Sequence, residues 1–487
     1  MMAMRKLRTA VAVVLGTAVL GLLYPANQVS VIASGEPFTG SGNAQLFLPV
    51  VQTAPEFTPQ VNAPLLDGTF DWAQTAITWF GRVSASENYA DVRVGYSPTH
   101  LNIRVNTFDR LLWFDQTPTS SSLTEWDAVS LYLDLAGNSG GVSGPNSYMF
   151  TGQLNWTANE EAWQAAWQGS GSGWQPSAIP FTMSNDWRGN APNDSNDDKG
   201  WSLSFEIPFE SLGFATAPPT GTSWGLGLTL FDRDSASGPP LPSKKWPVDL
   251  DGNEPSSWGR LRFGIPAHSP PPVGQTSTVE IRHGQAGMTV SDAHVGGGFL
   301  CGQPYYPDFF NGWGDANFAG DHKFNIQNQH DVSDWPCFSK TYIIFPLNQI
   351  PAGKVIVAAN LRLYQQGNSG QGSGGTVPDS FIQVLSAQSG WNESMITWNN
   401  APLAWQNYGG RWVSPMSNPG PPPPPPVPWD WDVSQAVADA YAANTAARLV
   451  LYSSDLGQHS GKYFLSSESG NSNPTLRPTL TVIWGDP

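Results

Sequence analysis

The sequence predicts an all-β protein built from two β-sandwiches of the jelly-roll type, joined by a Pro-rich linker, with one short helix in the second sandwich. Gly and Pro number 50 and 43 among 487 residues, and only 13% of the chain is charged. This composition favours many short strands joined by turns. Apolar residues recur at every second position in several runs, and helical periodicity is nearly absent outside one segment.

The N-terminus predicts export. Arg5, Lys6 and Arg8 precede an uncharged apolar stretch, residues 10–23, as in a secretory signal. The stretch is shorter than the about 20 residues of a membrane helix. We therefore expect residues 1–33 to be a signal peptide or a retained N-terminal anchor, and the protein to be secreted or held at the cell surface. Residues 34–61, rich in Gly, Pro, Ser and Thr, predict a tether.

The first sandwich is expected over residues 62–267. Apolar residues alternate in 92–96 and again in 101–105, which predicts a hairpin with its turn at residues 97–100. Further strands are expected at residues 128–133, 202–207, 225–230 and 260–263. Strands at this spacing, separated by turn residues, are typical of a sandwich.

A Pro-rich segment predicts the boundary between the sandwiches. Residues 269–274 read Ser-Pro-Pro-Pro-Val-Gly, so residues 268–275 are expected to form a semi-rigid linker and residues 276–487 the second sandwich. Within it, residues 433–443 predict the helix, with Ser434 as its N-cap, followed by a strand at 448–452. The longer proline run, 421–426, predicts a projecting surface loop.

The second half carries a specific Trp-bearing signature. It consists of WNESMITWNNAP (391–402), LRLY (361–364), WDVSQAV (431–437), FLSSES (464–469) and RPTLTVIW (477–484). This pattern resembles the DNRLRE domain over about residues 276–485, and relatives of that domain are classed as family 96 carbohydrate-binding modules. The resemblance implies a β-sandwich of a secreted or cell-surface microbial protein with a role connected to sugars.

The first half carries a second, less specific pattern. It consists of Leu66-Asp67-Gly68 with Asp71-Trp72, Glu125-Trp126-Asp127 before a strand ending at Asp134, Phe205 to Phe209 with Leu212-Gly213, and Trp258-Gly259. Over about residues 62–265 this order resembles family 9 carbohydrate-binding modules and their DOMON-like relatives. The resemblance implies a second sugar-binding sandwich.

Tryptophan is the candidate residue for sugar binding, because the apolar faces of saccharide rings stack on aromatic planes. The chain has 22 Trp. Trp113, Trp156, Trp174 and Trp187 lie in polar, Gly-rich sequence, and we predict that one or two of them form the main glycan site. The alternative for each is a place in the core. Trp405, Trp412 and Trp429 flank the proline loop and are further candidates, whereas Trp391 and Trp398 are expected in the core.

Two acidic loops predict calcium binding. They offer oxygen side chains at alternate positions, namely Asp194, Asn196 and Asp198 in one loop, and Asp249, Asp251 and Asn253 in the other. Asp232 and Asp234 lie near the second loop in sequence. The alternative is that both loops are simply solvated acidic turns.

The two cysteines predict a disulfide. Cys301 and Cys337 are the only cysteines, and an exported chain reaches an oxidising compartment, so we expect them to be joined. The alternative is a pair of buried thiols. Two cysteines without paired histidines give little support for a zinc site.

Charge and motifs limit the possible functions. The formal net charge of -16 argues against nucleic acid as a partner. A glycosidase would need two carboxylates across a cleft, for which Asp109, Glu125, Asp127 and Glu206 are available, but no catalytic motif is present and no catalytic residue is assigned. The sequence therefore predicts a non-catalytic protein that binds polysaccharide or cell-surface glycan. A self-associating structural surface protein and a polysaccharide-cleaving enzyme are the alternatives.

Overall fold

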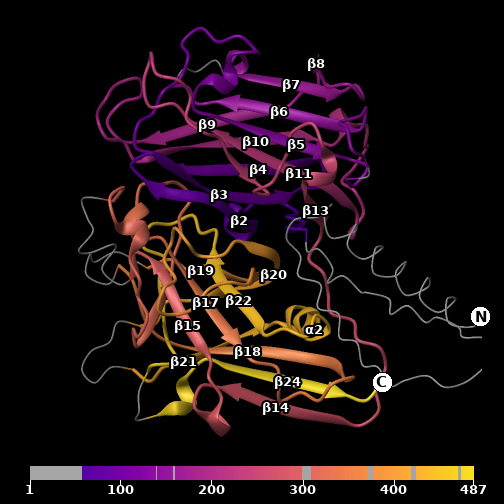
Figure 1. The fold of residues 1–487 in the computed structure, drawn as a ribbon, viewed down its shortest axis with the longest axis vertical. Helices are drawn as coiled ribbons and strands as arrows, with labels where there is room; N and C mark the ends of the chain where they lie inside the picture. The colour runs from indigo at the N-terminus through magenta and orange to yellow at the C-terminus, as the bar shows by residue number, and fades with distance from the viewer. Residues whose placement is uncertain are drawn as a thin grey trace, which may run out of the picture. The chain divides into compact units, whose positions relative to one another are not determined.

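The computed structural model describes residues 58–138, 140–156, 160–298, 309–370, 377–417, 424–469 and 473–487. The chain divides into two units, Met1–Thr53 and Ala54–Pro487. The first unit, with the predicted signal and most of the predicted tether, lies outside the described residues. Within the second unit the strands form four sheets, packed in pairs as two sandwiches (Figure 1). This confirms the predicted all-β class.

The first sandwich pairs a sheet of eight strands with a sheet of five. The larger sheet has the order β1-β13-β11-β5-β6-β7-β8, with β12 beside β11. Its strands are β1 Gln60–Ala63, β5 Ala128–Asp134, β6 Ser147–Gln153, β7 Gln164–Gly169, β8 Trp174–Ser177, β11 Ser223–Phe231, β12 Lys244–Trp246 and β13 Gly259–Phe263. The smaller sheet has the order β2-β3-β4-β10-β9. Its strands are β2 Ala76–Ser84, β3 Glu87–Tyr96, β4 His100–Phe108, β9 Thr182–Arg188 and β10 Gly200–Pro208.

The second sandwich pairs a sheet of six strands with a sheet of five. The larger has the order β14-β24-β18-β23-β16, with β21 beside β18, and the smaller has the order β15-β17-β22-β19-β20. The larger contains β14 Thr276–Arg282, β16 Lys323–Ile326, β18 Val355–Asn368, β21 Val427–Asp432, β23 Lys462–Leu465 and β24 Thr479–Gly485. The smaller contains β15 Ser291–Gly296, β17 Ser339–Phe345, β19 Ser380–Ala387, β20 Ala404–Val413 and β22 Ala447–Ser453.

Helices are short and few in the described part of the chain. The one α-helix there is α2, Ser434–Ala442. Single 3-10 turns are η1 Trp72–Gln74, η2 Leu123–Glu125, η3 Glu160–Trp163, η4 Glu210–Leu212, η5 Pro255–Ser257, η6 Gln285–Gly287, η8 Trp313–Asp315, η9 Trp335–Cys337 and η10 Pro474–Leu476. No helix of the described residues has the length and apolar character that crossing a membrane requires.

The strand predictions are confirmed, and the helix start is corrected. The predicted hairpin is β3 and β4, which pair antiparallel with Val94 opposite Ile103. The N-cap of α2 is Val433, not Ser434. Ser434 is instead the first helical residue, and its N–H donates to Asp432 Oδ1 at 2.9 Å. Its hydroxyl oxygen accepts from the N–H of Ala359 on β18 at 2.8 Å, so it anchors the helix to the sheet.

The two sandwiches share an apolar surface. Side chains on β2, β3 and the end of β4 pack with side chains of the second sandwich, all of them buried. From the first sandwich come Ile77, Trp79, Val83, Tyr89 and Phe108, and from the second come Phe309, Trp313, Phe338, Tyr342, Trp398 and Tyr452, among others. Trp398 thus lies in the core, as predicted. Each Å² of apolar surface that this contact removes from water contributes about 25 cal/mol to its stability.

A buried lysine lies at the centre of this surface. Lys340, on β17, is 0% exposed. Its Nζ lies 3.8 Å from the ring centroid of Trp398 and 4.2 Å from that of Trp79. It donates a hydrogen bond of 2.9 Å to the hydroxyl of Tyr89, and that hydroxyl donates to Asp91 Oδ1 at 2.6 Å. The aromatic faces and the Tyr89 hydroxyl therefore surround the Lys340 amino group in a place that water does not reach.

Asp91 and Arg93, both on β3, extend this buried network. Asp91 Oδ2 accepts from the Tyr452 hydroxyl at 2.8 Å and from Asn328 Nδ2 at 2.9 Å. Arg93 donates to Asn328 Oδ1 at 3.1 Å and to the carbonyl of Gln329. We call Asp91, Arg93 and Lys340 the interface cluster. Its charges have both signs, and its bonds cross from one sandwich to the other.

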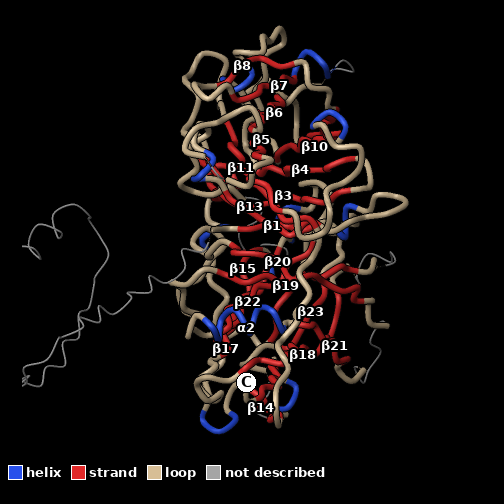
Figure 2. The backbone as a smooth tube through the Cα atoms, turned by 90° about the vertical axis from the view of Figure 1, so that its right-hand side faces the viewer, coloured by secondary structure: helices blue, strands red, loops and turns tan. Residues whose placement is uncertain are grey.

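Two edge strands complete the junction. Figure 2 shows β1, at the edge of the first sandwich, beside β20 of the second. The Asn62 N–H donates to Asn407 Oδ1 at 2.8 Å, and Asn407 Nδ2 donates to the Asn62 carbonyl at 2.9 Å. The amide side chain of Asn407 thus pairs with the backbone of β1 as a neighbouring strand would. The Pro-rich segment also contacts the second sandwich, since His268 Nε2 lies 2.9 Å from the Ile356 carbonyl oxygen.

Candidate functional site

A pocket of about 410 Å³ lies where β1 and β13 of the first sandwich meet β20 and α2 of the second. Figure 1 shows α2 beside β20 and below β13. The first sandwich side supplies Thr58, Gln60 and Arg260. The second supplies Ser386, Ala387, Ser389, Trp405, Gln406, Tyr408, Ala436, Asp439, Ala440, Ala443, Thr445, Ala446 and Arg448. We call this the seam pocket.

Asp439 is the acceptor at the centre of the polar side of the pocket. It stands on α2, where small neighbours, Ala436 and Ala440, leave room in front of the carboxylate. Asp439 Oδ1 accepts from Gln435 Nε2 at 2.8 Å. Its Oδ2 accepts from the Tyr408 hydroxyl at 3.1 Å and from Gln406 Nε2 at 3.2 Å. These bonds fix the carboxylate toward β20.

Gln406 and Tyr408 lie two positions apart on β20 and share one face of the strand. Gln406 Nε2 donates to the Tyr408 hydroxyl oxygen at 2.8 Å. Gln406 Oε1 accepts from Gln60 Nε2 of β1 at 2.9 Å, so the polar network crosses the seam. Burial, together with the charge of Asp439, raises the pKa of Tyr408. The tyrosine therefore remains a neutral donor and acceptor over the physiological range.

Two guanidinium groups and one indole complete the lining. Arg260 is exposed, and Arg448 is half-buried. Neither forms an ion pair with a carboxylate of the described residues, and Arg448 Nη1 donates to the Ala446 carbonyl at 3.5 Å. Trp405, one residue before Gln406, is half-buried and adds an aromatic surface.

This lining suits a small polyhydroxylated ligand. Ligand pockets commonly have volumes of about 300 to 1,000 Å³, and the seam pocket lies in the lower part of this range. Asp439, Gln406 and Tyr408 can accept from or donate to hydroxyls, and the arginines donate only. The indole and the alanines of α2 offer apolar contact. The pocket can bind, but its described lining contains a single carboxylate, Asp439.

The predicted glycan residues of the first sandwich lie apart from this pocket. Trp156 is 57% exposed and contacts Phe114 with ring centroids 6.1 Å apart. Trp113 is half-buried, and its backbone N–H donates to Asp127 Oδ2 at 2.6 Å. Trp174 and Trp187 are also half-buried, the first stacked on Trp258 and the second packed against the core. None of the four lines the seam pocket, and their role in sugar binding stays a prediction.

The predicted calcium residues lie in two separate loops. Asp194 and Asn196 are held by a local turn, in which the Asn196 N–H donates to Asp194 Oδ1 at 2.7 Å. Asp198 turns inward, is 3% exposed and accepts from the Asn190 N–H at 2.6 Å. The other three predicted residues, Asp249, Asp251 and Asn253, are exposed. A calcium ion at either loop stays a prediction.

The candidate carboxylates separate into two kinds. Asp109 and Asp127 are both fully buried at one end of the first sandwich. Glu125 and Glu206 are exposed, the latter in the middle of β10 opposite Asn102. Glu206 therefore does not face the buried pair across a cleft.

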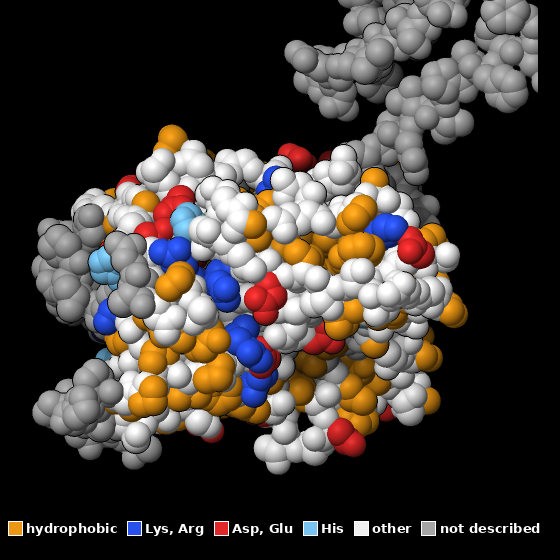
Figure 3. Space-filling model, turned by 90° about the horizontal axis from the view of Figure 1, so that it is seen from below, with side chains coloured by type: hydrophobic (Ala, Val, Ile, Leu, Met, Phe, Trp, Pro, Cys, Tyr) orange, Lys and Arg blue, Asp and Glu red, His pale blue; other side chains and the backbone are white. Residues whose placement is uncertain are grey.

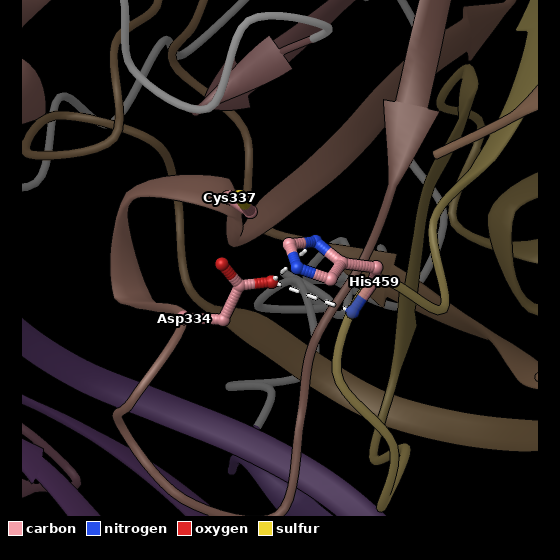
Figure 4. A group of neighbouring side chains, drawn as sticks. All are labelled: Asp334, Cys337 and His459. Atoms are coloured by element: carbon pink, nitrogen blue, oxygen red, sulfur yellow. Dashed lines mark hydrogen bonds and ion pairs between the residues drawn. The ribbon is translucent and has the colours of Figure 1, made fainter. Parts of the chain in front are cut away.

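Asp334, Cys337 and His459 lie together in the second sandwich (Figure 4). Asp334 Oδ2 accepts from the His459 N–H at 3.4 Å and lies 3.2 Å from His459 Nδ1. No described cysteine is free, so Cys337 is not available as a metal ligand. Cys301 lies outside the described residues, and its pairing with Cys337 stays a prediction. The Asp334–His459 contact joins two loops and needs no metal.

The face that carries β14, β24 and β18 has a line of Lys and Arg side chains beside hydrophobic ones (Figure 3). Arg362 on β18 and Lys354, the residue before β18, each form an ion pair. Arg362 Nε lies 2.8 Å from Asp430 Oδ1, and Lys354 forms an ion pair with Asp486. These pairs use charge that would otherwise attract an anionic partner.

Sequence reasoning named Trp405 but missed the other residues of the seam pocket. Asp439 gave one usable signal, since it is the only charged residue of the Ala-rich helix α2. No signal in the sequence marks Gln60, Gln406 or Arg260 as site residues, because only the packing of the two sandwiches brings them together.

The second sandwich has a family match. Residues 311–479 match the model of carbohydrate-binding module family 96. This confirms the resemblance seen in the second half of the sequence. The residues that the second sandwich contributes to the seam pocket, from Ser386 to Arg448, all lie within the matched range. No curated protein matches the sequence.

Solved structures of family 9 carbohydrate-binding modules are similar to part of the chain. One is a module from Caldicellulosiruptor kristjanssonii in complex with cellotriose, 13% identical, with a TM-score of 0.30 over 44% of this chain and 100% of that chain. Another, from the same organism in complex with glucose, is 14% identical, with a TM-score of 0.29 over 44% of this chain and 98% of that chain.

Proposed function

We propose that this chain is an exported carbohydrate-binding protein that holds a saccharide in the seam pocket without cleaving it. One observation carries the proposal. The pocket of about 410 Å³, with its indole and its hydrogen-bonding side chains, is built largely from residues inside the range that matches carbohydrate-binding module family 96.

The chemistry of the lining supports a neutral or weakly charged polyhydroxylated ligand. Asp439 and Gln406 offer acceptors for sugar hydroxyls, and Arg260 and Arg448 offer donors. Trp405 offers an aromatic surface for the apolar face of a ring. Binding would therefore combine a small apolar contact with several directed hydrogen bonds.

Two further observations support binding without cleavage and export. The described pocket lining has one carboxylate, whereas most glycosidases use two. The basic residues and apolar stretch near the N-terminus are typical of an export signal. Exposed Trp156, on the first sandwich, is proposed as a second contact for a long polysaccharide chain.

The test is a glycan array followed by calorimetry with the best ligand. Trp405→Ala should weaken binding by about 1 to 3 kcal/mol, as loss of an aromatic anchor does. Trp412→Ala is the matched control, because Trp412 lies on the same strand, is 40% exposed and does not line the pocket. Equal affinity of both variants would place the site elsewhere, and Trp156→Ala would then be examined. Release of reducing sugar or unsaturated product would instead establish an enzyme.

A further inference from the structure

Four aspartates meet at one end of the first sandwich. Asp109 follows the last residue of β4, Asp127 precedes the first residue of β5, and Asp232 follows the last residue of β11. Ala128 of β5 lies opposite Phe231 of β11, so Asp127 and Asp232 are neighbours. With Asp234 they form what we call the carboxylate cluster. Oxygens of Asp109, Asp232 and Asp234 all lie within 4.8 Å of one another.

The cluster is buried and partly supplied with hydrogen bonds. Asp109 and Asp127 are both 0% exposed, and Asp232 is 5% exposed. Asp109 accepts from the Leu111 N–H at 3.1 Å and from Trp201 Nε1 at 2.8 Å. Asp127 accepts from the N–H groups of Trp113 at 2.6 Å and Arg233 at 2.9 Å. These donors fix the carboxylates and leave each oxygen with further acceptor capacity.

Asp232 is different, and it gives the second, independent observation. Its Oδ1 is buried and forms no hydrogen bond of ordinary geometry among the described residues. One of its carboxylate oxygens lies within 4.8 Å of an oxygen of Asp109 and of Asp234. Buried polar atoms in folded proteins nearly always have a partner. A buried carboxylate oxygen that lacks a partner and belongs to a cluster of carboxylates is an arrangement that a bound cation would satisfy.

The cations near the cluster bind elsewhere. Arg233 donates from Nε to the Glu125 carbonyl at 2.7 Å, and its guanidinium lies over Trp126. Arg110 pairs with Asp197 at 2.7 Å, and Lys244 pairs with Glu87. No side chain of the described residues therefore neutralises the cluster by direct pairing. Burial and mutual repulsion raise the pKa of Asp109 and Asp127 and raise that of Asp232 to about 7.

We propose that Asp109, Asp232 and Asp234 bind a calcium ion, with Asp127 as a further oxygen ligand or a hydrogen-bonding neighbour. Calcium takes six to eight oxygen ligands and tolerates irregular geometry, which suits carboxylates from three separate strand ends. A divalent cation would neutralise the like charges and satisfy Asp232 Oδ1. It would also link the ends of β4, β5 and β11, and so hold the two sheets of the first sandwich together.

The test uses the full chain after treatment with a chelator. Terbium, which replaces calcium at oxygen sites, should luminesce on excitation of tryptophan, because Trp201 is hydrogen-bonded to Asp109. Calcium should displace it, and calcium should raise the melting temperature. Asp232→Asn should weaken calcium binding at least tenfold. Asp251→Asn is the matched control, since Asp251 is exposed in a predicted calcium loop and lies outside the cluster.

Three results would overturn the proposal. They are no sensitised luminescence, identical melting in calcium and in chelator, or equal calcium affinity of Asp232→Asn and the unaltered protein. The first two would mean that protons and not a metal neutralise the cluster. If Asp232→Asn fails to fold, Asp234→Asn, at a half-buried position, serves in its place. If only Asp251→Asn lost calcium affinity, the calcium site would lie in the exposed loop and not in the carboxylate cluster.

Discussion

The interface cluster and the carboxylate cluster both bury several charged side chains, but only the interface cluster combines charges of opposite sign. Asp91 accepts from two tyrosines and an asparagine, and Lys340 lies among aromatic faces. The carboxylate cluster has four acids and no directly paired cation among the described residues. Buried charges of opposite sign stabilise one another and act as a structural link, whereas buried charges of one sign repel and favour a bound cation. Substitutions should therefore change stability in opposite directions at the two places.

The largest change in the free energy of unfolding is expected on substitution of Asp91. Asp91→Ala would leave the hydroxyls of Tyr89 and Tyr452 and the amide of Asn328 without their acceptor, and it would leave Lys340 and Arg93 buried without an anion. We expect a loss of about 3 to 5 kcal/mol in the free energy of unfolding, because removing one partner of a buried pair leaves the other charge buried and uncompensated. Urea denaturation measures it. Asp67→Ala, at an exposed position, should change stability by less than about 0.5 kcal/mol. A loss at Asp91 as small as this would show that the interface cluster is not a structural link.

At Asp232 we expect a substitution to increase the free energy of unfolding of the metal-free protein, the opposite of the effect at Asp91. In chelator at pH 8, Asp232→Asn removes a negative charge from the carboxylate cluster. We expect the metal-free protein to become more stable by about 1 kcal/mol, since repulsion between buried like charges is relieved. In excess calcium the same substitution should be destabilising, because it removes a ligand. Urea denaturation of the unaltered protein and of Asp232→Asn, each in chelator and in excess calcium, measures the four free energies of unfolding. Destabilisation in chelator would show that Asp232 has a stabilising partner without metal.

The sequence predicted the sandwiches because their strands repeat with a local period. The hairpin of β3 and β4 followed from apolar alternation, and this pattern survives because each strand has a face in the core. The places where distant strands meet carry no such signal. Asn62 and Asn407 are far apart in sequence and bond only because two edge strands lie together. In the same way Asp232 was noted beside an acidic loop, but its neighbour Asp109 comes from the opposite sheet.

Composition does not separate exposed from buried tryptophan. The chain has 22 Trp, and several of them lie in the core. Trp79, Trp201, Trp224, Trp246, Trp258 and Trp313 are among the largest fully buried side chains. Trp79 and Trp398 surround Lys340, which looked in sequence like an ordinary polar position of a strand. A residue's type does not reveal which distant rings will face it, so the interface cluster could not be predicted.

The smallest effect concerns the pH dependence of the interface cluster. Burial lowers the pKa of Lys340 well below its usual value of about 10.4. Between the lowered pKa of the folded state and the usual pKa of the unfolded chain, the unfolded chain binds more protons, so stability from this group rises with pH. Lys340→Met keeps the volume and removes the titration. Between pH 7 and pH 9 the free energy of unfolding should rise more steeply with pH in the unaltered protein than in Lys340→Met. The expected difference in slope is positive and at most about 1 kcal/mol per pH unit. Urea denaturation at pH 7, 8 and 9 measures both slopes. Equal slopes for the two proteins would mean that Lys340 stays protonated in the folded state from pH 7 to pH 9. The aromatic faces and Asp91 would then stabilise its charge as well as water does in the unfolded chain.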